Sequence, residues 1–423
     1  MSFSARFKCI TRIAARVCGV GAILLAGCAS EPWRKTLTEE EFKARTEAAK
    51  ADQLAAMTDA SKRIIDRVTK EMEANDPSNP PDIHFLAISG GGDWGAFGSG
   101  FLVGWGEAPE GSRRPNFDVV TGVSTGALLA PFAFVNTDES CARVDKFYRN
   151  PASDWVESRG MFFFLPSNSS FMVIPNLEKA VGVAMDKEMI EQVAAQARDG
   201  KILAVSATDL DLGMQHFWNL GAAAEQAEKT GDFERVRRMM LASAAIPVAF
   251  PPVEIDGVLY ADGGVTANVF LRLDPRSPVG IIQTWKRMHP GKPLPKVRFW
   301  IILNNQTTQT PSTVQRRWPA ILGPSIPTSI RSATLSEIRW IAAQADFINA
   351  TMNADIEVRM VSIPDAWRVP VPGDFKDETM RALSDLGRKM GADPASWQLL
   401  ASPATVRDLR SQVVPELDAP VMK

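Results

Sequence analysis

Three glycine-containing motifs, in a fixed order along the chain, constrain its fold most. Each follows an apolar, strand-like run: first Ser89-Gly-Gly-Gly92, then Gly122-Val-Ser-Thr-Gly126, then Asp262-Gly-Gly264. The middle motif is typical of a nucleophile elbow, a tight turn from a strand into a helix that presents the serine hydroxyl at the helix N-terminus. The apolar run Ala127–Val135 behind it fits such a helix. The motifs therefore predict strands that lead into helices.

The stretch from residue 82 to 310 extends this pattern. Strand-like runs separated by helical patterns cover Ile83–Ile88, Phe117–Val120 and Val297–Leu303, and a polar turn separates Ile202–Ser206 from His216–Asn219, as in a hairpin or strand connection. Alternation of this kind favours a parallel sheet with helices on its faces. We therefore expect an α/β fold with a mostly parallel central sheet sandwiched by helices.

Further elements flank this core. Thr38 and Glu41 form a capping box at the start of a helix that reaches about Ala74. We expect a stalk helix packed loosely on the main domain, since its apolar stripe is thin and consists of Ile64, Ile65, Val68 and Met72. Beyond Pro311 we expect a helix at Leu335–Ala350 and a strand at Ile356–Val361. A last helix is expected at Asp377–Met390, with a C-cap at Gly391.

These patterns divide the chain into four parts. Residues 1–27 are expected to be a signal peptide, 28–80 a tether and helical stalk, 81–310 the catalytic domain, and 311–423 a C-terminal elaboration packed on that domain. The chain's 423 residues and 45% hydrophobic content are sufficient for a substantial core. The last 50 residues carry no recognisable chemistry.

The N-terminus has the pattern of a secretory signal. Four Lys or Arg residues precede a short apolar stretch from Val17 to Leu25, and no acidic residue occurs before Glu31. The ending Leu25-Ala-Gly-Cys28 resembles a bacterial lipobox, which implies that Cys28 carries the lipid in the mature protein; a plain signal peptide is the alternative. Because Ala29 follows the cysteine, outer-membrane localisation is expected. Acyl chains on Cys28 would hold the protein on a membrane.

The cysteine content and the net charge indicate which disulfides and binding partners can be expected. With the signal removed and Cys28 acylated, Cys141 has no partner, so no disulfide framework is expected. The formal charge of −2 becomes −6 once the four basic residues of the signal are lost, and no basic face is evident. Nucleic acid is therefore not an expected partner. Nothing in the sequence indicates an oligomeric state.

The glycine loop at 90–95 has two interpretations. It matches the dinucleotide-binding pattern G-x-G-x-x-G, which requires an acidic residue about 20 positions on, at the end of a second strand. The corresponding region, Glu107–Glu110, is typical of a loop, and that interpretation leaves the serine motif unexplained. Consecutive glycines at a helix N-terminus can instead donate their N–H groups to an oxyanion.

The sequence leaves two candidates for the general base. His84 and His216 lie inside strand-like runs and are expected to be packing residues, whereas Ser124, Asp262 and His289 follow the chain order of an α/β-hydrolase triad. His289, however, stands in a loop rich in Pro and Gly. A partly desolvated Asp262 could take the serine proton directly.

These motifs together resemble the patatin-like phospholipase family over roughly residues 82–310. Ala207–Gly213 and Ala242–Pro252 are also similar to family segments that flank the site. The resemblance implies an α/β sandwich and a catalytic dyad of Ser124 as nucleophile and Asp262 as base, with Gly90, Gly91 and Gly92 as the oxyanion loop. The chain departs from many members at Asp93-Trp94, where they carry a basic residue; this puts in doubt help from a cation at the oxyanion.

The implied activity is hydrolysis of ester bonds in phospholipids or lysophospholipids, with a membrane lipid as substrate and no metal or cofactor. Three alternatives stay open from sequence: a triad esterase that uses His289, an acyltransferase with the same dyad, and a catalytically silent lipid-binding lipoprotein. The apolar runs Met161–Leu165 and Phe171–Ile174 predict either a lid over an acyl-chain pocket or a buried segment with a surface loop.

Overall fold

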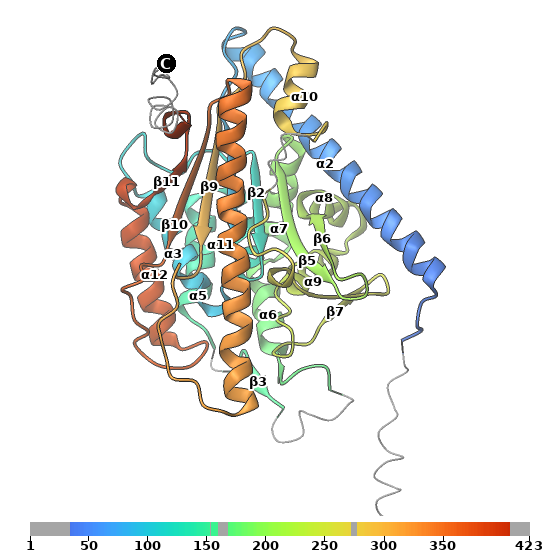
Figure 1. Ribbon diagram of the computed structural model, residues 1–423, viewed down its shortest axis with the longest axis vertical. Coiled ribbons are helices and arrows are strands. Elements are labelled where there is room, and N and C mark those ends of the chain that lie inside the picture. The colour runs from blue at the N-terminus through green and yellow to red at the C-terminus, as the bar shows by residue number, and fades with distance from the viewer. Residues whose placement is uncertain (1–33, 153, 160–167, 272–276, 407–423) are drawn as a thin grey trace, which may run out of the picture.

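A computed structural model of the chain describes residues 34–152, 154–159, 168–271 and 277–406. The expected signal peptide, Cys28 and the apolar run 161–165 lie outside these residues. The fold is built on one nine-stranded sheet in the order β11-β10-β9-β1-β2-β5-β8-β7, with β6 paired to β5 (Figure 1). Its strands are β1 Ile83–Ile88, β2 Val119–Val123, β5 Ile202–Asp209, β6 Met214–Asn219, β7 Val253–Ile255, β8 Val258–Asp262, β9 Val297–Leu303, β10 Ile356–Ser362 and β11 Gln398–Ala401.

The centre of the sheet is parallel. Strands β10, β9, β1, β2 and β5 run in one direction, and β11, β6, β8 and β7 add antiparallel pairs at the two sides. The expected hairpin is confirmed, because β5 and β6 pair antiparallel from Ala204 with Asn219 to Asp209 with Met214. A separate two-stranded sheet joins β3 (Glu157–Ser158) to β4 (Met172–Val173). The predicted α/β sandwich with a mixed, mostly parallel core is thereby confirmed.

Helices cover both faces of the sheet, and the alternation of side chains along each strand supplies both cores. In β1, Leu86 and Ile88 belong to one buried cluster, whereas Phe85 and Ala87 belong to the other. The first cluster is completed by α3 Gly95–Gly106, α4 Thr125–Val135, α5 Asp138–Arg149, α6 Pro175–Ala184, α7 Lys187–Arg198, α8 Leu220–Thr230, α9 Phe233–Ser243 and α12 Asp377–Gly391. The second is completed by α2 Glu39–Asn75, α10 Ile281–Met288 and α11 Trp318–Met352.

Helix α2 begins as predicted but packs more tightly than predicted. Thr38 is its N-cap, and the capping box with Glu41 is formed. The expectation of loose packing is wrong for its C-terminal half, where the stripe of four apolar residues is at most 3% exposed and joins the second core cluster. A thin stripe is sufficient because α2 lies across the sheet beside α10 (Figure 1).

The C-terminal segment adds strands to the same sheet. The strand and last helix occur where predicted, and α11 is longer than predicted, starting at Trp318 with Pro324 and Pro327 inside it. The predicted C-cap at Gly391 is wrong, since Gly391 ends α12 and Ala392 is the cap. Gly391 is needed for close packing on α3 instead, because a Cβ there would lie 2.3 Å from the carbonyl oxygen of Phe101.

No helix in the described part of the chain combines the length and apolar character needed to cross a membrane. In the second of the two apolar runs considered as a lid, Met172 and Val173 form β4, and Ile174 is buried. These residues therefore belong to the body of the molecule.

Candidate active site

Ser124 occupies the sharp turn between β2 and α4. Its backbone has φ +55° and ψ −124°, a left-handed conformation that non-glycine residues adopt rarely, and it is the N-cap residue of α4. The turn closes only because its neighbours lack side chains. A Cβ on Gly122 would lie 2.3 Å from the carbonyl oxygen of Gly126, and one on Gly126 would lie 2.1 Å from that of Ile88. The motif thus forms the nucleophile elbow expected from it.

The structure brings Ser124 and Asp262 together. The Oγ hydroxyl of Ser124 donates to Oδ2 of Asp262 at 2.5 Å, and Oδ1 accepts the N–H of Gly264 at 2.7 Å. Ser124 is 5% exposed and Asp262 is 6% exposed. Burial raises the pKa of Asp262 to about 6, against the opposing effect of the two hydrogen bonds. A carboxylate of this basicity in contact with a hydroxyl can accept its proton.

The segment 242–252 and the end of β5 hold this pair in place. Ser124 N–H donates to Oγ of Ser243 at 3.0 Å, and that hydroxyl donates to the carbonyl oxygen of Ser206 at 2.5 Å. The carbonyl oxygen of Ala245 accepts the N–H of Asp262 at 2.8 Å. Ser243, the last residue of α9, thereby links α9, β5 and the elbow, a role that the sequence did not predict for the segment 242–252. The small residues of this segment are the only feature of the sequence that could have indicated this supporting role.

The glycine loop lies against the nucleophile. A Cβ on Gly90 would lie 2.9 Å from the Cβ of Ser124, so only glycine fits there. Gly90 N–H donates to Oδ1 of Asn268 at 3.0 Å, which commits this donor to the protein. Within the described residues, the N–H groups of Gly91 and Gly92 donate no hydrogen bond to other protein atoms. Of the three predicted oxyanion glycines, these two therefore offer available donors.

Asn268 is a positioning residue that sequence reasoning missed. Its Nδ2 donates to Oγ1 of Thr334 at 3.1 Å, while Oε2 of Glu337 accepts the N–H groups of Asn268 and Val269 at 3.2 and 3.3 Å. Burial raises the pKa of Glu337 to about 7. Helix α11 thus supports the glycine loop from outside the part of the chain where the motifs lie, and no local pattern around Thr334 signals this.

Asp93 and Trp94, which follow the three glycines, contact a different part of the fold. Asp93 is buried and accepts the N–H of Phe375 at 3.0 Å, and its burial raises its pKa to about 6. Trp94 packs edge-on against Trp367, with ring centroids 5.5 Å apart. Both contacts join the glycine loop to the segment between β10 and α12. The pair therefore anchors that segment beside the site.

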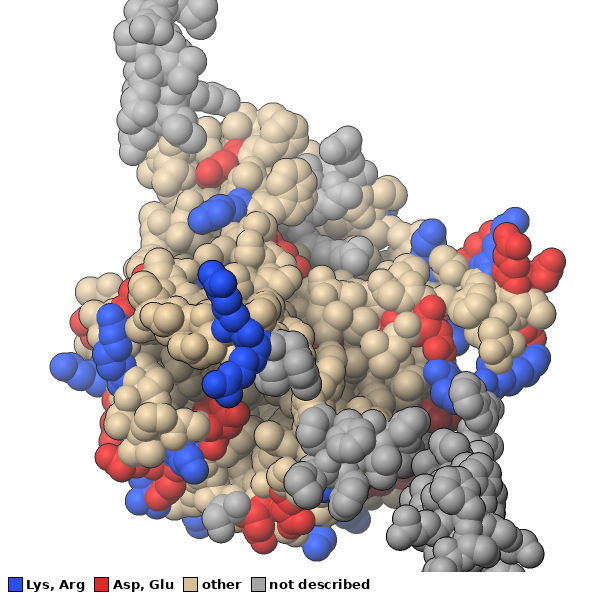
Figure 2. Space-filling view, turned by 60° about the horizontal axis from the view of Figure 1, so that its bottom comes forward, with Lys and Arg blue, Asp and Glu red and all other residues tan. Residues whose placement is uncertain are grey.

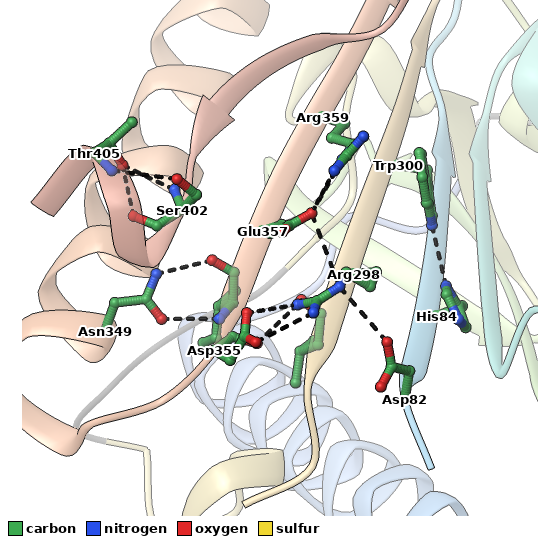
Figure 3. A network of polar contacts seen from close by, with 12 residues as sticks. Asp82, His84, Arg298, Trp300, Asn349, Asp355, Glu357, Arg359, Ser402 and Thr405 are labelled. Atoms are coloured by element: carbon green, nitrogen blue, oxygen red, sulfur yellow. Dashed lines mark hydrogen bonds and ion pairs between the residues drawn. The ribbon is translucent and has the colours of Figure 1, made fainter. Parts of the chain in front are cut away.

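The three histidines lie elsewhere. Nε2 of His289 is 2.7 Å from Oγ1 of Thr69 on α2, and its ring packs on Trp285. His289 precedes the start of β9, whereas Ser124 follows the end of β2, so the two lie at opposite ends of parallel strands. In β1, Nδ1 of His84 accepts Trp300 Nε1–H, as Figure 3 shows beside the Arg298 ion-pair network. His216 packs between Trp218 and Tyr260. This geometry does not support a triad through His289.

Within the part of the chain that the structure describes, no group of three or more His, Cys, Asp or Glu side chains is arranged to hold a metal ion. Cys141 is a free, buried cysteine. The chemistry that the site itself displays is that of a buried serine and carboxylate beside glycine N–H donors.

Comparison with known proteins identifies the segment that carries this site. Residues 86–273 match the model of the family described as patatin-like phospholipase. No curated protein sequence matches the chain. Two crystal structures show a low level of similarity. VipD from Legionella pneumophila has 12% sequence identity and a TM-score of 0.38, and the match covers 78% of this chain and 70% of VipD. The type III effector protein ExoU has 14% identity and a TM-score of 0.31, and the match covers 74% of this chain and 53%, about half, of ExoU. The matched residues 86–273 contain Ser124, Asp262 and the glycine loop.

Proposed function

We propose that this protein is a serine acyl hydrolase that cleaves ester bonds of phospholipids or lysophospholipids through a Ser124–Asp262 dyad. One observation carries the proposal: a buried serine at a strained elbow donates directly to a buried carboxylate 2.5 Å away. The match of residues 86–273 to the family described as patatin-like phospholipase supports the reaction class.

In the proposed reaction, the deprotonated carboxylate of Asp262 takes the proton of Ser124 as Oγ attacks the acyl carbonyl. The negative charge that develops on the carbonyl oxygen is stabilised by the free N–H groups of Gly91 and Gly92. Collapse of the tetrahedral intermediate expels the alcohol, which receives the proton held by Asp262. Water, deprotonated by Asp262, then attacks the acyl-enzyme, the fatty acid leaves, and Ser124 regains its proton.

Gly90 has a different role in this proposal. Because Asn268 already accepts its N–H, Gly90 contributes the absence of a side chain next to Ser124 and fixes the loop through that hydrogen bond. Each oxyanion donor is expected to supply about 3–4 kcal/mol of transition-state stabilisation. The two remaining glycines would together account for several orders of magnitude in rate.

We further propose that Cys28 is acylated and holds the enzyme on a membrane of a bacterial envelope, with the outer membrane as the expected location. The Leu25-Ala-Gly-Cys28 sequence and the following Ala29 support this proposal. Incorporation of a labelled fatty acid into the wild type, and its loss in Cys28→Ser, is the expected result. A wild-type protein of unmodified mass in isolated membranes would contradict it.

Replacement of Ser124 by alanine tests the function. Purified wild type should release fatty acid from phospholipid or lysophospholipid in detergent micelles, and Ser124→Ala should lose at least about a thousandfold of that rate. Ser78→Ala, at an exposed serine remote from the site, is the matched control. Equal rates in Ser124→Ala and wild type would refute the mechanism. An inactive wild type whose Ser124 also resists acylating probes would favour a silent lipid-binding lipoprotein.

A further inference from the structure

We propose that the face of the molecule at the carboxyl ends of the parallel strands docks on a phospholipid bilayer, with the edge of the sheet that holds Ser124 toward the lipid. This docking face carries Leu210, Val248, Val265, Val314, Ile321 and Val369. The inference rests on the proposed function in one respect, that the substrate lies in the bilayer. It goes beyond that function by naming the surface that meets the lipid.

The exposed apolar side chains are concentrated at this edge. Eleven large apolar side chains of the described residues are at least 40% exposed, and six of them form the docking face. Leu210 directly follows β5, Val314 lies after β9, and Val369 lies after β10. The carboxyl ends of parallel strands meet at one edge of a sheet, and Ser124 follows β2 at the same edge.

Two more of these side chains lie next to the dyad in the chain. Val265 is three residues beyond Asp262, in the short helix η3 (Gly263–Val265) that the carboxylate itself caps. Val248 is three residues beyond Ala245, whose carbonyl oxygen accepts the N–H of Asp262. An apolar rim around a buried catalytic pair suits a substrate whose acyl chains come from lipid.

Helix α11 contributes a projecting element. It has 35 residues and therefore spans about 52 Å, whereas the seven residues of β9 span about 23 Å. Since α11 leads into β10, its first turns lie at the carboxyl edge and extend past it (Figure 1). Residues 318–330 carry no charge, and Arg316 and Arg317, both exposed, precede them. Basic residues beside an apolar helix end suit anionic headgroups.

The N-terminal tether reaches the same edge. Arg34 donates twice to the carboxylate of Asp211, at 2.8 Å each, and to the carbonyl oxygen of Gly257 at 3.1 Å. These acceptors lie in the β5–β6 and β7–β8 turns, at the carboxyl end of β5. Arg34 is six positions beyond Cys28 in the chain, so an anchor at Cys28 could lie at most about 20 Å away. The amino ends of the parallel strands are much farther from Cys28, because the chain reaches them only after α2, which is about 55 Å long.

Figure 2 looks obliquely onto this end of the molecule. Uncharged residues fill much of its upper and central part and basic side chains stand near its middle, whereas acidic residues lie below these and toward the left, lower and right-hand borders, among further basic ones. A mostly uncharged area with basic groups suits a bilayer containing anionic lipid. A soluble protein partner would make contacts on a face of this kind as well, and the experiment separates the two.

The test places a fluorophore at single cysteines and measures its contact with lipid. The mature full chain, purified from membranes and reconstituted into phosphatidylcholine and phosphatidylglycerol vesicles with brominated acyl chains, is labelled at Leu210→Cys, Val265→Cys or Ile321→Cys. Controls are Leu54→Cys, Trp340→Cys and Leu399→Cys, which are also exposed but lie elsewhere. Cys141 is fully buried and does not compete for the label.

We expect bromine quenching to reduce the fluorescence on the order of twofold at the three docking-face positions, with no change at the controls, because an interfacial surface enters about 5–10 Å into the headgroup region. Quenching at the control positions, or at none of the six, overturns the proposal; so does a failure of the chain to float with vesicles. The measurement needs no turnover and can be repeated in Ser124→Ala. An active Ser124→Ala with unchanged quenching would refute the mechanism and leave the docking face standing.

Discussion

The Oγ hydroxyl of Ser124 donates directly to Oδ2 of Asp262, and no histidine of the described residues lies between or beside them. Burial is the largest influence on this carboxyl and raises its pKa to about 6. The carboxyl that we propose as the base therefore has a pKa of about 6, raised by burial, and needs no imidazole to reach it. This relationship separates a two-residue mechanism from a triad.

The first prediction concerns the pH dependence of activity. Asp262 acts as a base only when deprotonated, so kcat/KM for a soluble ester should rise through a single inflection near pH 6 and level off above it. His289→Ala should keep the profile and rate of the wild type, because His289 contacts Thr69 far from the site. A loss of a hundredfold or more in His289→Ala would contradict the dyad.

The second prediction concerns the glycine loop. Gly91→Ala should abolish activity and destabilise the fold, because its Cβ would lie 2.3 Å from the backbone carbonyl oxygen of Asn304. Gly92→Ala meets no atom within 4 Å but must keep φ +62°, so we expect a loss of about 1–2 kcal/mol in the free energy of unfolding. Gly111→Ala, with φ +82° and equal space, is the matched control. Chemical denaturation measures all three, and wild-type stability of Gly91→Ala would show the packing to be wrong.

The third prediction tests Asn268 as a positioning residue. Asn268→Ala removes the acceptor of Gly90 N–H and should lower kcat by about 10–100-fold with KM little changed, since small displacements of catalytic geometry have effects of this size. Thr334→Val, which removes the partner of Asn268 Nδ2 but leaves the Gly90 contact, should lose far less. Steady-state kinetics on a soluble ester decides; equal kcat in Asn268→Ala and wild type would remove Asn268 from the site's support.

The fourth prediction concerns stability and pH. The raised pKa of Asp262 means that the folded protein binds this proton more tightly than the unfolded chain, so its contribution to stability is present below about pH 4 and is lost as pH rises through 6. Asp262→Asn lacks this titration. Its free energy of unfolding relative to wild type should therefore increase by about 2–3 kcal/mol between pH 4 and pH 7. A difference that stays constant with pH would mean that the carboxyl is not perturbed.

The fifth prediction concerns helix α2. Ile65 is fully buried in the second core cluster, so Ile65→Ala should lower the free energy of unfolding by about 2–5 kcal/mol. Leu54, which is 54% exposed on the same helix, supplies the control, and Leu54→Ala should change stability by less than about 1 kcal/mol. Similar small effects for both variants would restore the picture of a loosely packed stalk.

The sequence predicted the elements whose signals are local. The elbow at Ser124, the strands that precede the three motifs and the capping box at Thr38 each depend on neighbouring residues, and each occurs where predicted. The tight packing of α2 was missed because a thin apolar stripe does not reveal how well its partner surface fits. Gly391 was taken for a helix cap, whereas its role is to let α12 approach α3, a contact between segments almost 300 residues apart.

The contacts that hold the site in place could not be predicted from local sequence patterns for the same reason: they join residues that are far apart in the chain. Asn268 follows the Asp-Gly-Gly motif closely, yet its partner Gly90 is 178 positions away, and Thr334 is 66 positions in the other direction. Nothing around Gly90 indicates that its N–H is committed while those of Gly91 and Gly92 remain available. Such pairings depend on how the glycine loop, η3 and α11 meet at the edge of the sheet.

In the mechanism that we propose, Ser124 is a nucleophile activated by Asp262 alone. A fluorophosphonate probe, followed by peptide mapping with mass spectrometry, tests this most directly. We expect one adduct, on Ser124, whose rate of formation rises with pH through about 6, falls at least about a hundredfold in Asp262→Asn and is unchanged in His289→Ala. An adduct on another serine, or labelling of Ser124 that depends on His289 and not on Asp262, would contradict it.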